Sequence, residues 1–211
     1  MKYKALFLLF VVQFFAVTSF SKGLDEAVRR YLAGKPGEIG VAVIIQDRDT
    51  LAWNNDSPYP LMSVCKLFQA LSVADYLCEN RLSLQTPVTI GEEDLQPDTY
   101  SPLRDRYPRG GVTLTVADLL RYSLQLSDNN ACDILFRMTG GPQQTDRYLR
   151  ELGLEDFRIA VDEAEMHRDL ASCYENWSTP LETACLVNRL FTTAFLPDTL
   201  QQFICRTLLD C

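Results

Sequence analysis

The chain of 211 residues has a single histidine, His167, and its seven cysteines contain no Cys-x-x-Cys pair. Structural zinc sites use several cysteine and histidine ligands at short spacing, so the sequence argues against one, and we expect no metal or other cofactor. The Gly-x-Ser-x-Gly motif of many serine hydrolases is also absent. A serine hydrolase that relies on a histidine base is therefore disfavoured.

Basic residues are few as well. Lysine and arginine number 20 against 28 acidic residues, for a net charge of −8. This balance argues against nucleic acid and anionic membrane surfaces as partners. Only five of the basic residues are lysines, and none follows Lys66.

The first 21 residues have the composition of a secretory signal peptide. Lys2 and Lys4 form a basic start, residues 5–17 are almost wholly apolar, and small residues precede Lys22. The apolar run is too short for a good membrane-spanning helix, and no cysteine that could carry a lipid follows closely. We predict cleavage near Ser21–Lys22 and a periplasmic or secreted protein. Loss of both lysines leaves 18 basic residues and a net charge of −10.

The cysteines occur at irregular spacings. Most of them stand beside apolar residues, so we interpret them as small core residues. Cys185 and Cys205 are examples. The count is odd, so at least one thiol is unpaired, and we expect no obligatory disulfide.

The remaining sequence predicts one hairpin followed by an almost wholly helical body. A helix is expected over 24–32 and two strands over 39–46 and 51–54. Further helices are predicted over 115–125, 130–138, 145–152, 179–195 and 197–209, with loops over 100–111 and 155–178. We divide the chain into a signal peptide (1–21), a helix with two strands of a sheet (22–60) and a mainly helical part (61–211).

A helix that starts near Ser63 is the central element. Its apolar positions continue for about four turns, which predicts a buried helix; they are Val64, Leu67, Phe68, Leu71, Ala74 and Leu77. Ser63 and Lys66 are three residues apart, so both side chains lie on one face. A serine nucleophile needs a base within hydrogen-bond reach, and a helix start can stabilise an oxyanion. Ser-x-x-Lys alone is weak evidence, since Ser19 and Lys22 also fit it.

The rarer triplet Ser127-Asp128-Asn129 makes the catalytic interpretation the stronger one. With Ser63-Val64-Cys65-Lys66, it resembles the motifs of the class A serine β-lactamases, in particular the divergent branch with CfxA- and PER-like enzymes. The resemblance extends from Leu24 onward and implies an α/β (α+β) fold of the serine β-lactamase and DD-peptidase type. It also implies hydrolysis of a small β-lactam through an acyl-enzyme, by a protein expected to be monomeric.

The resemblance assigns roles to eight residues. Ser63 is the nucleophile, Lys66 and Ser127 move protons, Asn129 binds the substrate amide and Asp128 holds the loop. Glu163 activates the deacylating water, with Glu165 as the alternative. Tyr100 flanks the pocket, and His167 helps to orient the water near Glu163.

One family motif, Lys-Thr/Ser-Gly on a sheet strand, has no counterpart after Lys66. From this we expect a C-terminally truncated product whose 211 residues are not a competent enzyme by themselves. Two alternatives stay open: a penicillin-binding, DD-peptidase-like protein, and an inactive remnant or β-lactam-binding module. Replacement of Glu163 would distinguish a hydrolase from a DD-peptidase, because only the hydrolase needs that residue for deacylation.

Overall fold

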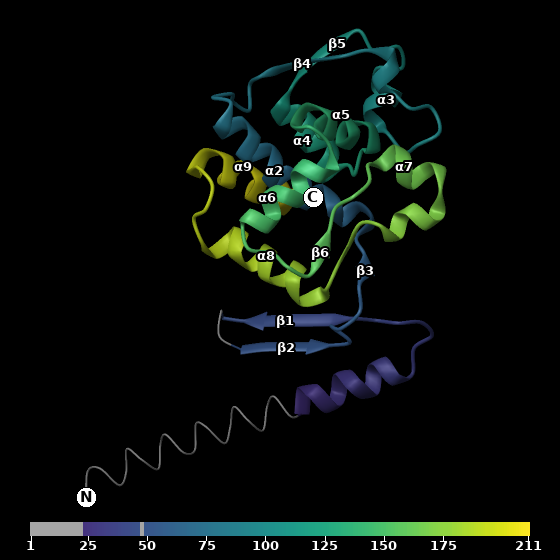
Figure 1. Ribbon diagram of the computed structural model, residues 1–211, viewed down its shortest axis with the longest axis vertical. Helices are drawn as coiled ribbons and strands as arrows, with labels where there is room; N and C mark the ends of the chain where they lie inside the picture. The colour runs from purple at the N-terminus through teal and green to yellow at the C-terminus, as the bar shows by residue number, and fades with distance from the viewer. Residues whose placement is uncertain (1–22, 47–48) are drawn as a thin grey trace, which may run out of the picture.

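The computed structural model describes residues 23–46 and 49–211. The predicted signal peptide lies outside the described residues. A helix over 23–33 packs beneath an antiparallel hairpin of β1 (Val41–Ile45) and β2 (Asp49–Trp53), apart from the helical body (Figure 1). The indole of Trp53 donates to Asp25 Oδ1 at 2.7 Å and connects helix and hairpin. The predicted helix and hairpin are confirmed.

The helical body surrounds α2 (Cys65–Glu79), which follows the short 3-10 helix η1 (Met62–Val64). Every residue from Cys65 to Ala74 is buried, so α2 is central, as its apolar pattern predicted. Val64 was predicted to lie inward and is instead 46% exposed, because it belongs to η1 and precedes the first turn of α2.

Five further helices complete the body: α4 (Val116–Gln125), α5 (Asn129–Thr139), α6 (Pro142–Glu151), α8 (Pro180–Thr192) and α9 (Asp198–Leu209). All of them except α8 pack directly against α2, and α8 packs against α9. All five were predicted, with ends shifted by up to three residues. Thr115 caps α4 as expected, because its side chain accepts from the Asp118 N–H while the Asp118 side chain accepts from the Thr115 N–H. Helix α8 also packs against β1 and so connects the body to the hairpin.

The segment 100–111, predicted as loop, contains a helix, α3 (Pro102–Arg106). Ser101 caps this helix and Pro102 occupies its first turn, so the start signal was present in the sequence. The sequence interpretation also missed a two-stranded ladder of β4 (Pro87–Ile90) and β5 (Val112–Thr115), whose partners are 24 residues apart at Thr89 and Thr113. Strands of four residues are too short for a clear periodic pattern.

The segment 155–178 is also more regular than predicted. It contains β6 (Phe157–Arg158), α7 (Glu163–Arg168), the 3-10 helix η3 (Leu170–Tyr174) and β7 (Trp177–Ser178). Strand β7 lies between β6 and β3 (Tyr59–Pro60), so both ends of the segment meet beside the residues that lead into α2. The acidic residues 92–94 form one more 3-10 helix, η2 (Glu92–Asp94).

The seven cysteines are all free. Cys65, Cys132 and Cys173 are buried, whereas Cys185 is exposed on α8, so its interpretation as a core residue was wrong. None of the helices in residues 23–46 and 49–211 combines the length and apolar character needed to cross a bilayer.

Candidate active site

Ser63 stands at the surface, in the 3-10 turn that leads into α2. Its neighbour Met62 has a left-handed backbone with φ +47°, a conformation that costs energy for a residue with a side chain. The Leu61 N–H donates to the backbone oxygen of Asn176 at 2.9 Å, which anchors this entry to the segment 155–178. The hydroxyl is therefore displayed on a strained turn that the surrounding fold holds in place.

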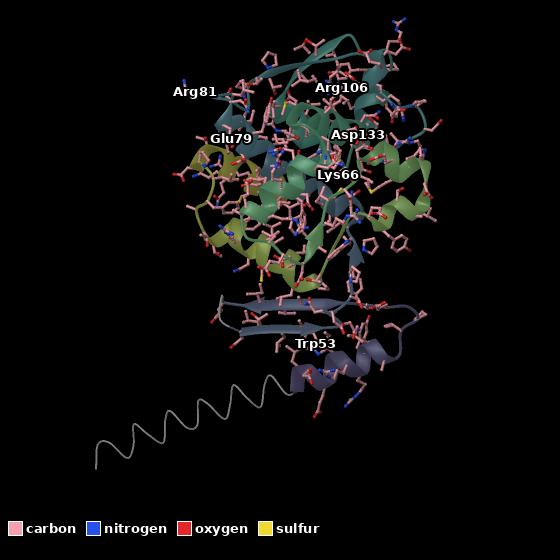
Figure 2. The ribbon with its side chains drawn as sticks, viewed as in Figure 1. Trp53, Lys66, Glu79, Arg81, Arg106 and Asp133 are labelled. Atoms are coloured by element: carbon pink, nitrogen blue, oxygen red, sulfur yellow. The ribbon has the colours of Figure 1, made fainter. Side chains whose placement is uncertain are left out.

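Lys66 lies one turn further along α2 and is 2% exposed. Its ammonium donates to Ser63 Oγ at 3.2 Å, to Asn129 Oδ1 at 2.9 Å and to Glu163 Oε1. An ammonium has three N–H groups, so each N–H of Lys66 has an acceptor. Lys66 is thus the centre of a network that joins α2, α5 and α7. Figure 2 labels Lys66 within the helical body.

The charge of Lys66 follows from its surroundings. Burial acts to lower its pKa, but nearby acidic groups outweigh burial and raise the pKa above the usual 10.5. Cys132 is among those groups, yet burial raises its own pKa well above 9, so that thiol is neutral at pH 7. Glu163, which forms an ion pair with Lys66, is the partner that stabilises the charged form at neutral pH.

Ser127 lies between α4 and α5 and donates from Oγ to Ser63 Oγ at 2.9 Å. Its backbone is left-handed, with φ +53°. Such strain is kept where the surrounding structure requires it, and it is frequent at catalytic sites. The two serines and Lys66 therefore form a continuous hydrogen-bonded chain.

Asp128 is fully buried and holds the turn together. Its carboxylate accepts from the N–H of Ala131 at 2.8 Å, from the N–H of Leu103 at 2.6 Å and from Ser101 Oγ at 2.9 Å. Burial raises its pKa, and these hydrogen bonds partly offset the effect. Its contacts are structural, since they cap α5 and attach α3.

Asn129 is the first residue of α5 and has partners on both sides. Its Oδ1 accepts from Lys66, and its Nδ2 donates to Thr99 Oγ1 at 2.7 Å. Its backbone N–H donates to the carbonyl of Tyr100 at 3.1 Å, while the Tyr100 side chain is 62% exposed. The side chain of Tyr100 therefore stands at the surface beside the network.

The structure distinguishes the two candidate carboxylates of α7. Glu163 is 8% exposed and contacts Lys66. The Glu165 side chain is 44% exposed and lies 3.8 Å from Arg168. Glu163, and not Glu165, is thus the carboxylate brought to the serine.

His167 is exposed near the end of α7. Among the described residues, no hydrogen bond connects it with Glu163 or with any other member of the network. It borders a separate cavity of about 380 Å³ with Thr99, Asp133 and Arg168. The structure therefore does not bring His167 together with the groups that surround Ser63.

Two positioning residues were missed in the sequence. Asp133 on α5 accepts from the N–H groups of Glu163 and Ala164, and buried Asn176 accepts from the N–H groups of Ala160 and Val161. Their partners are 15 to 31 residues away along the chain. The only local signal was that Asp133 follows Asn129 by one helical turn, which places both on the same face.

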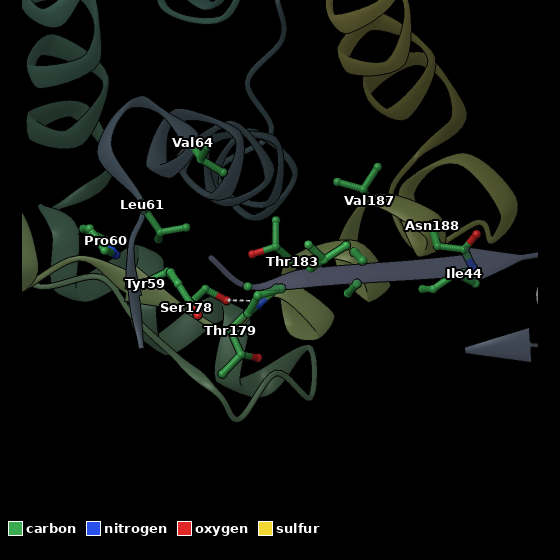
Figure 3. Close-up of a pocket in the computed structure, with 15 residues that line it drawn as sticks. Ile44, Tyr59, Pro60, Leu61, Val64, Ser178, Thr179, Thr183, Val187 and Asn188 are labelled. Atoms are coloured by element: carbon green, nitrogen blue, oxygen red, sulfur yellow. Dashed lines mark hydrogen bonds between the residues drawn. The ribbon is translucent and has the colours of Figure 1, made fainter. Parts of the chain in front are cut away.

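A groove of about 710 Å³ lies beside this network, between β1, α8 and the entry to α2 (Figure 3). Its walls are mostly apolar and include Val64, Val187 and Ile44. The side chains of the network around Lys66 are not part of its lining. The described residues contain no cluster of three or more side chains suited to hold a metal ion.

Comparison with known proteins agrees with this geometry. The model of the beta-lactamase enzyme family matches residues 23–210. A beta-lactamase of Phocaeicola vulgatus is 42% identical over 189 residues, which are 89% of this chain and 59% of that protein. Beta-lactamase VEB-1 of Pseudomonas aeruginosa is 34% identical, over 84% of this chain and 60% of its own length. The chain thus spans about three fifths of the length of these relatives.

Solved structures with a similar fold are also beta-lactamases. The extended-spectrum beta-lactamase TLA-3 superposes with a TM-score of 0.87 at 34% identity, over 90% of this chain and 69% of the other. A class A beta-lactamase of Bacteroides cellulosilyticus gives 0.84 at 32% identity, with coverages of 90% and 68%. The predicted α+β fold is confirmed, and the chain belongs to the beta-lactamase enzyme family, with the architecture of its class A members.

Proposed function

We propose that this chain carries the catalytic groups of a secreted serine β-lactamase, which opens the β-lactam ring of penicillins or cephalosporins through an acyl-enzyme and confers resistance to them. One observation carries the proposal: the hydrogen-bonded chain Ser127–Ser63–Lys66–Glu163. It places a nucleophile, two proton carriers and a carboxylate in contact, as acyl transfer requires.

In the acylation step, Ser63 Oγ bonds to the lactam carbonyl carbon and its proton must leave. Lys66 is a cation in the resting state, so it has to pass a proton toward Glu163 before its amine can accept the serine proton. The direct contact between the two side chains provides that path. Glu163 acting through a water is the other route, and this geometry serves both.

When the tetrahedral intermediate collapses, the C–N bond of the ring breaks and the nitrogen needs a proton. Ser127 is suited to supply it, because its hydroxyl lies 2.9 Å from Ser63 Oγ, the atom that bonds to the carbonyl carbon next to that nitrogen. Asn129 is placed to bind the substrate amide, as its side chain stands beside both Lys66 and Thr99.

Deacylation releases the product. Glu163 removes a proton from a water, the water oxygen bonds to the acyl carbon, and the ester bond to Ser63 breaks as Oγ regains its proton. A well-placed general base contributes about 10²- to 10⁴-fold. The proposal includes export after cleavage near Ser21–Lys22, a monomer, and Tyr100 as an exposed wall of the substrate site. His167 has no part in it.

Intact-mass spectrometry with a penicillin tests the proposal. In a protein that also carries the Lys-Thr/Ser-Gly strand, we expect an adduct on Ser63 that is lost with time, no adduct in Ser63→Ala, and a long-lived adduct in Glu163→Gln; the 211 residues by themselves are expected not to hydrolyse the penicillin. Glu165→Gln is the matched control and should behave like the parent protein. A stable adduct on the parent would instead indicate a penicillin-binding, DD-peptidase-like protein, and no adduct at all would contradict the proposal.

A further inference from the structure

The segment 96–100, called the 96–100 loop below, leads from η2 toward α3 and contains no helix or strand. Its last two residues reach the reactive network. Thr99 Oγ1 accepts from Asn129 Nδ2 at 2.7 Å, and the Tyr100 carbonyl accepts from the Asn129 N–H at 3.1 Å. Residues 96–98 are exposed, so apolar packing contributes little to their position. The loop therefore depends on hydrogen bonds to stay against Asn129.

The carbonyl groups of this loop find their donors outside the backbone. Among residues 23–46 and 49–211, the carbonyls of Gln96, Pro97 and Thr99 accept from no backbone N–H. Backbone carbonyls of folded proteins are almost always paired, so these three need a side chain or water. Arg104 on α3 is that side chain. Its Nη1 donates to the Gln96 oxygen at 2.9 Å, to the Pro97 oxygen at 2.7 Å and to the Thr99 oxygen at 2.7 Å.

The guanidinium of Arg104 is largely covered by these contacts. Its side chain is 21% exposed, and its second terminal nitrogen, Nη2, lies 3.0 Å from Asp105 Oδ1. Donors on a cation form stronger hydrogen bonds than neutral donors do. Among the described residues, the one other side chain that bonds to any of the three carbonyls is Asn130, which donates to Gln96 at 3.3 Å. Arg104 is thus the main attachment of the loop.

The contact with Thr99 decides how the Asn129 amide is oriented. The ammonium of Lys66 has only donors, so Asn129 turns Oδ1 toward it and Nδ2 away from it. On the far side, Thr99 Oγ1 accepts from Nδ2. A displaced loop would leave Nδ2 without this acceptor and allow the amide to rotate. Residues 96–99 also line the cavity of about 380 Å³ together with residues of α7, so the loop shapes that cavity.

We propose that Arg104 is a positioning residue of this site: its guanidinium gathers the carbonyl groups of the 96–100 loop and so keeps Thr99 against the Asn129 amide. Helix α3 gives Arg104 a fixed base, because the buried Asp128 accepts from the Leu103 N–H. The catalytic consequence rests on the proposed function, in which Asn129 binds the substrate amide. The effect on the loop itself can be measured without substrate.

Nuclear magnetic resonance of the full chain tests the effect on the loop. In the parent protein we expect ¹⁵N order parameters of about 0.85 at Thr99 and Tyr100, the value of a rigid backbone. Arg104→Met keeps a long stem and removes the donors, so both values should fall below about 0.6. The Asn129 amide donates to the loop, so its protection from hydrogen exchange should fall about tenfold.

Arg104→Lys tests the role of the charge. A lysine ammonium has three N–H groups on a single nitrogen, so order parameters between those of the parent and Arg104→Met are expected. Values as low as those of Arg104→Met would contradict the role given to the cation. If Arg104→Met does not fold, Arg104→Gln takes its place, and the neutral amide should also loosen the loop.

The matched control is Arg106→Met. Arg106 belongs to the same helix and is exposed, and among the described residues its side chain donates to none of the three loop carbonyls. This substitution should leave residues 98–100 unchanged. Equal order parameters in Arg104→Met and the parent, or the same loss in Arg106→Met, would overturn the proposal.

The catalytic readout needs a protein that also carries the Lys-Thr/Ser-Gly strand. There Arg104→Met should raise KM for a penicillin about tenfold and change kcat less than about threefold, because Asn129 binds substrate without taking part in bond formation. Arg104→Lys should recover part of the lost affinity. If the parent takes no adduct, the proposed function fails, and the order parameters still decide the role of Arg104 in the loop. If the parent hydrolyses the penicillin and Arg104→Met has the same KM, Arg104 does not position Asn129 for the substrate.

Discussion

The two sides of the reactive network are built differently. Ser63, Lys66, Ser127 and Asn129 lie at the starts or ends of buried helices, and the interior side of α2 is closely packed. Glu163 lies in the segment 155–178, which adds some residues to the apolar core and whose backbone N–H groups also donate to the side chains of Asp133, Asn176 and Asp146. Apolar packing thus dominates around Ser63 and Lys66, whereas polar contacts to the backbone contribute more around Glu163.

This difference has a physical consequence. Apolar contacts are many and individually weak, so a buried helix tolerates the loss of one. A buried polar side chain that accepts two or three backbone N–H groups is harder to replace, because its removal leaves those groups unsatisfied. The carboxylate side has two such residues, Asp133 and Asn176, against one, Asp128, on the other side, so it should be the more fragile to single substitutions.

The largest expected effect comes from breaking the contact between the two sides. Lys66→Ala leaves the carboxylate of Glu163 buried without its cation, which costs about 3–5 kcal/mol of unfolding free energy. Urea denaturation at pH 7 measures it. Lys35→Ala, at an exposed lysine over the Tyr31 ring, is the control and should change stability by less than about 0.5 kcal/mol. Similar values for the two variants would show that the ion pair contributes nothing.

The next largest effect is expected from a substitution on the carboxylate side alone. Asn176→Ala removes two accepted bonds, from Ala160 and Val161, and one donated bond to the Val161 carbonyl. We expect a loss of about 2–3 kcal/mol and faster proteolysis within 155–178, with the helical body unaffected.

Asn80→Ala, at an exposed asparagine that bonds only to the Tyr76 carbonyl, is the matched control for proteolysis. Cleavage of the Asn176→Ala variant in α4 or α5 as fast as in 155–178 would contradict the division into two sides.

The smallest effect is expected at the cap of α4, on the nucleophile side. Hydrogen bonds from Thr115 lower the pKa of Asp118 below its usual value. A lowered carboxyl pKa stabilises the protein above about pH 4, and that stability is lost as the pH falls through the folded-state value. Asp118→Asn should cost about 0.5 kcal/mol at pH 7, since Asp118 is partly exposed. The parent and the variant should converge in urea titrations as the pH falls below the lowered pKa of Asp118; a gap that stays constant with pH would exclude the charge as its cause.

Prediction from the sequence was most successful where local rules suffice. The spacing of Ser63 and Lys66, the Thr115 cap and the apolar pattern of α2 all act within one or two helical turns. The Ser127-Asp128-Asn129 triplet could be related to Ser63 only through a family resemblance, since 64 residues separate the two serines. Their contact at 2.9 Å is a property of the packed helices.

The sequence by itself determined the long helices, the hairpin and the family, because propensities, caps and periodic patterns depend on near neighbours. Only the tertiary structure decided that Glu163 and not Glu165 meets Lys66, that His167 faces another cavity, and that Asp133 holds α7. Glu163 and Glu165 are two residues apart on a short helix, so their side chains point in different directions. Which of them meets Lys66 depends on contacts between segments that are tens of residues apart in the chain.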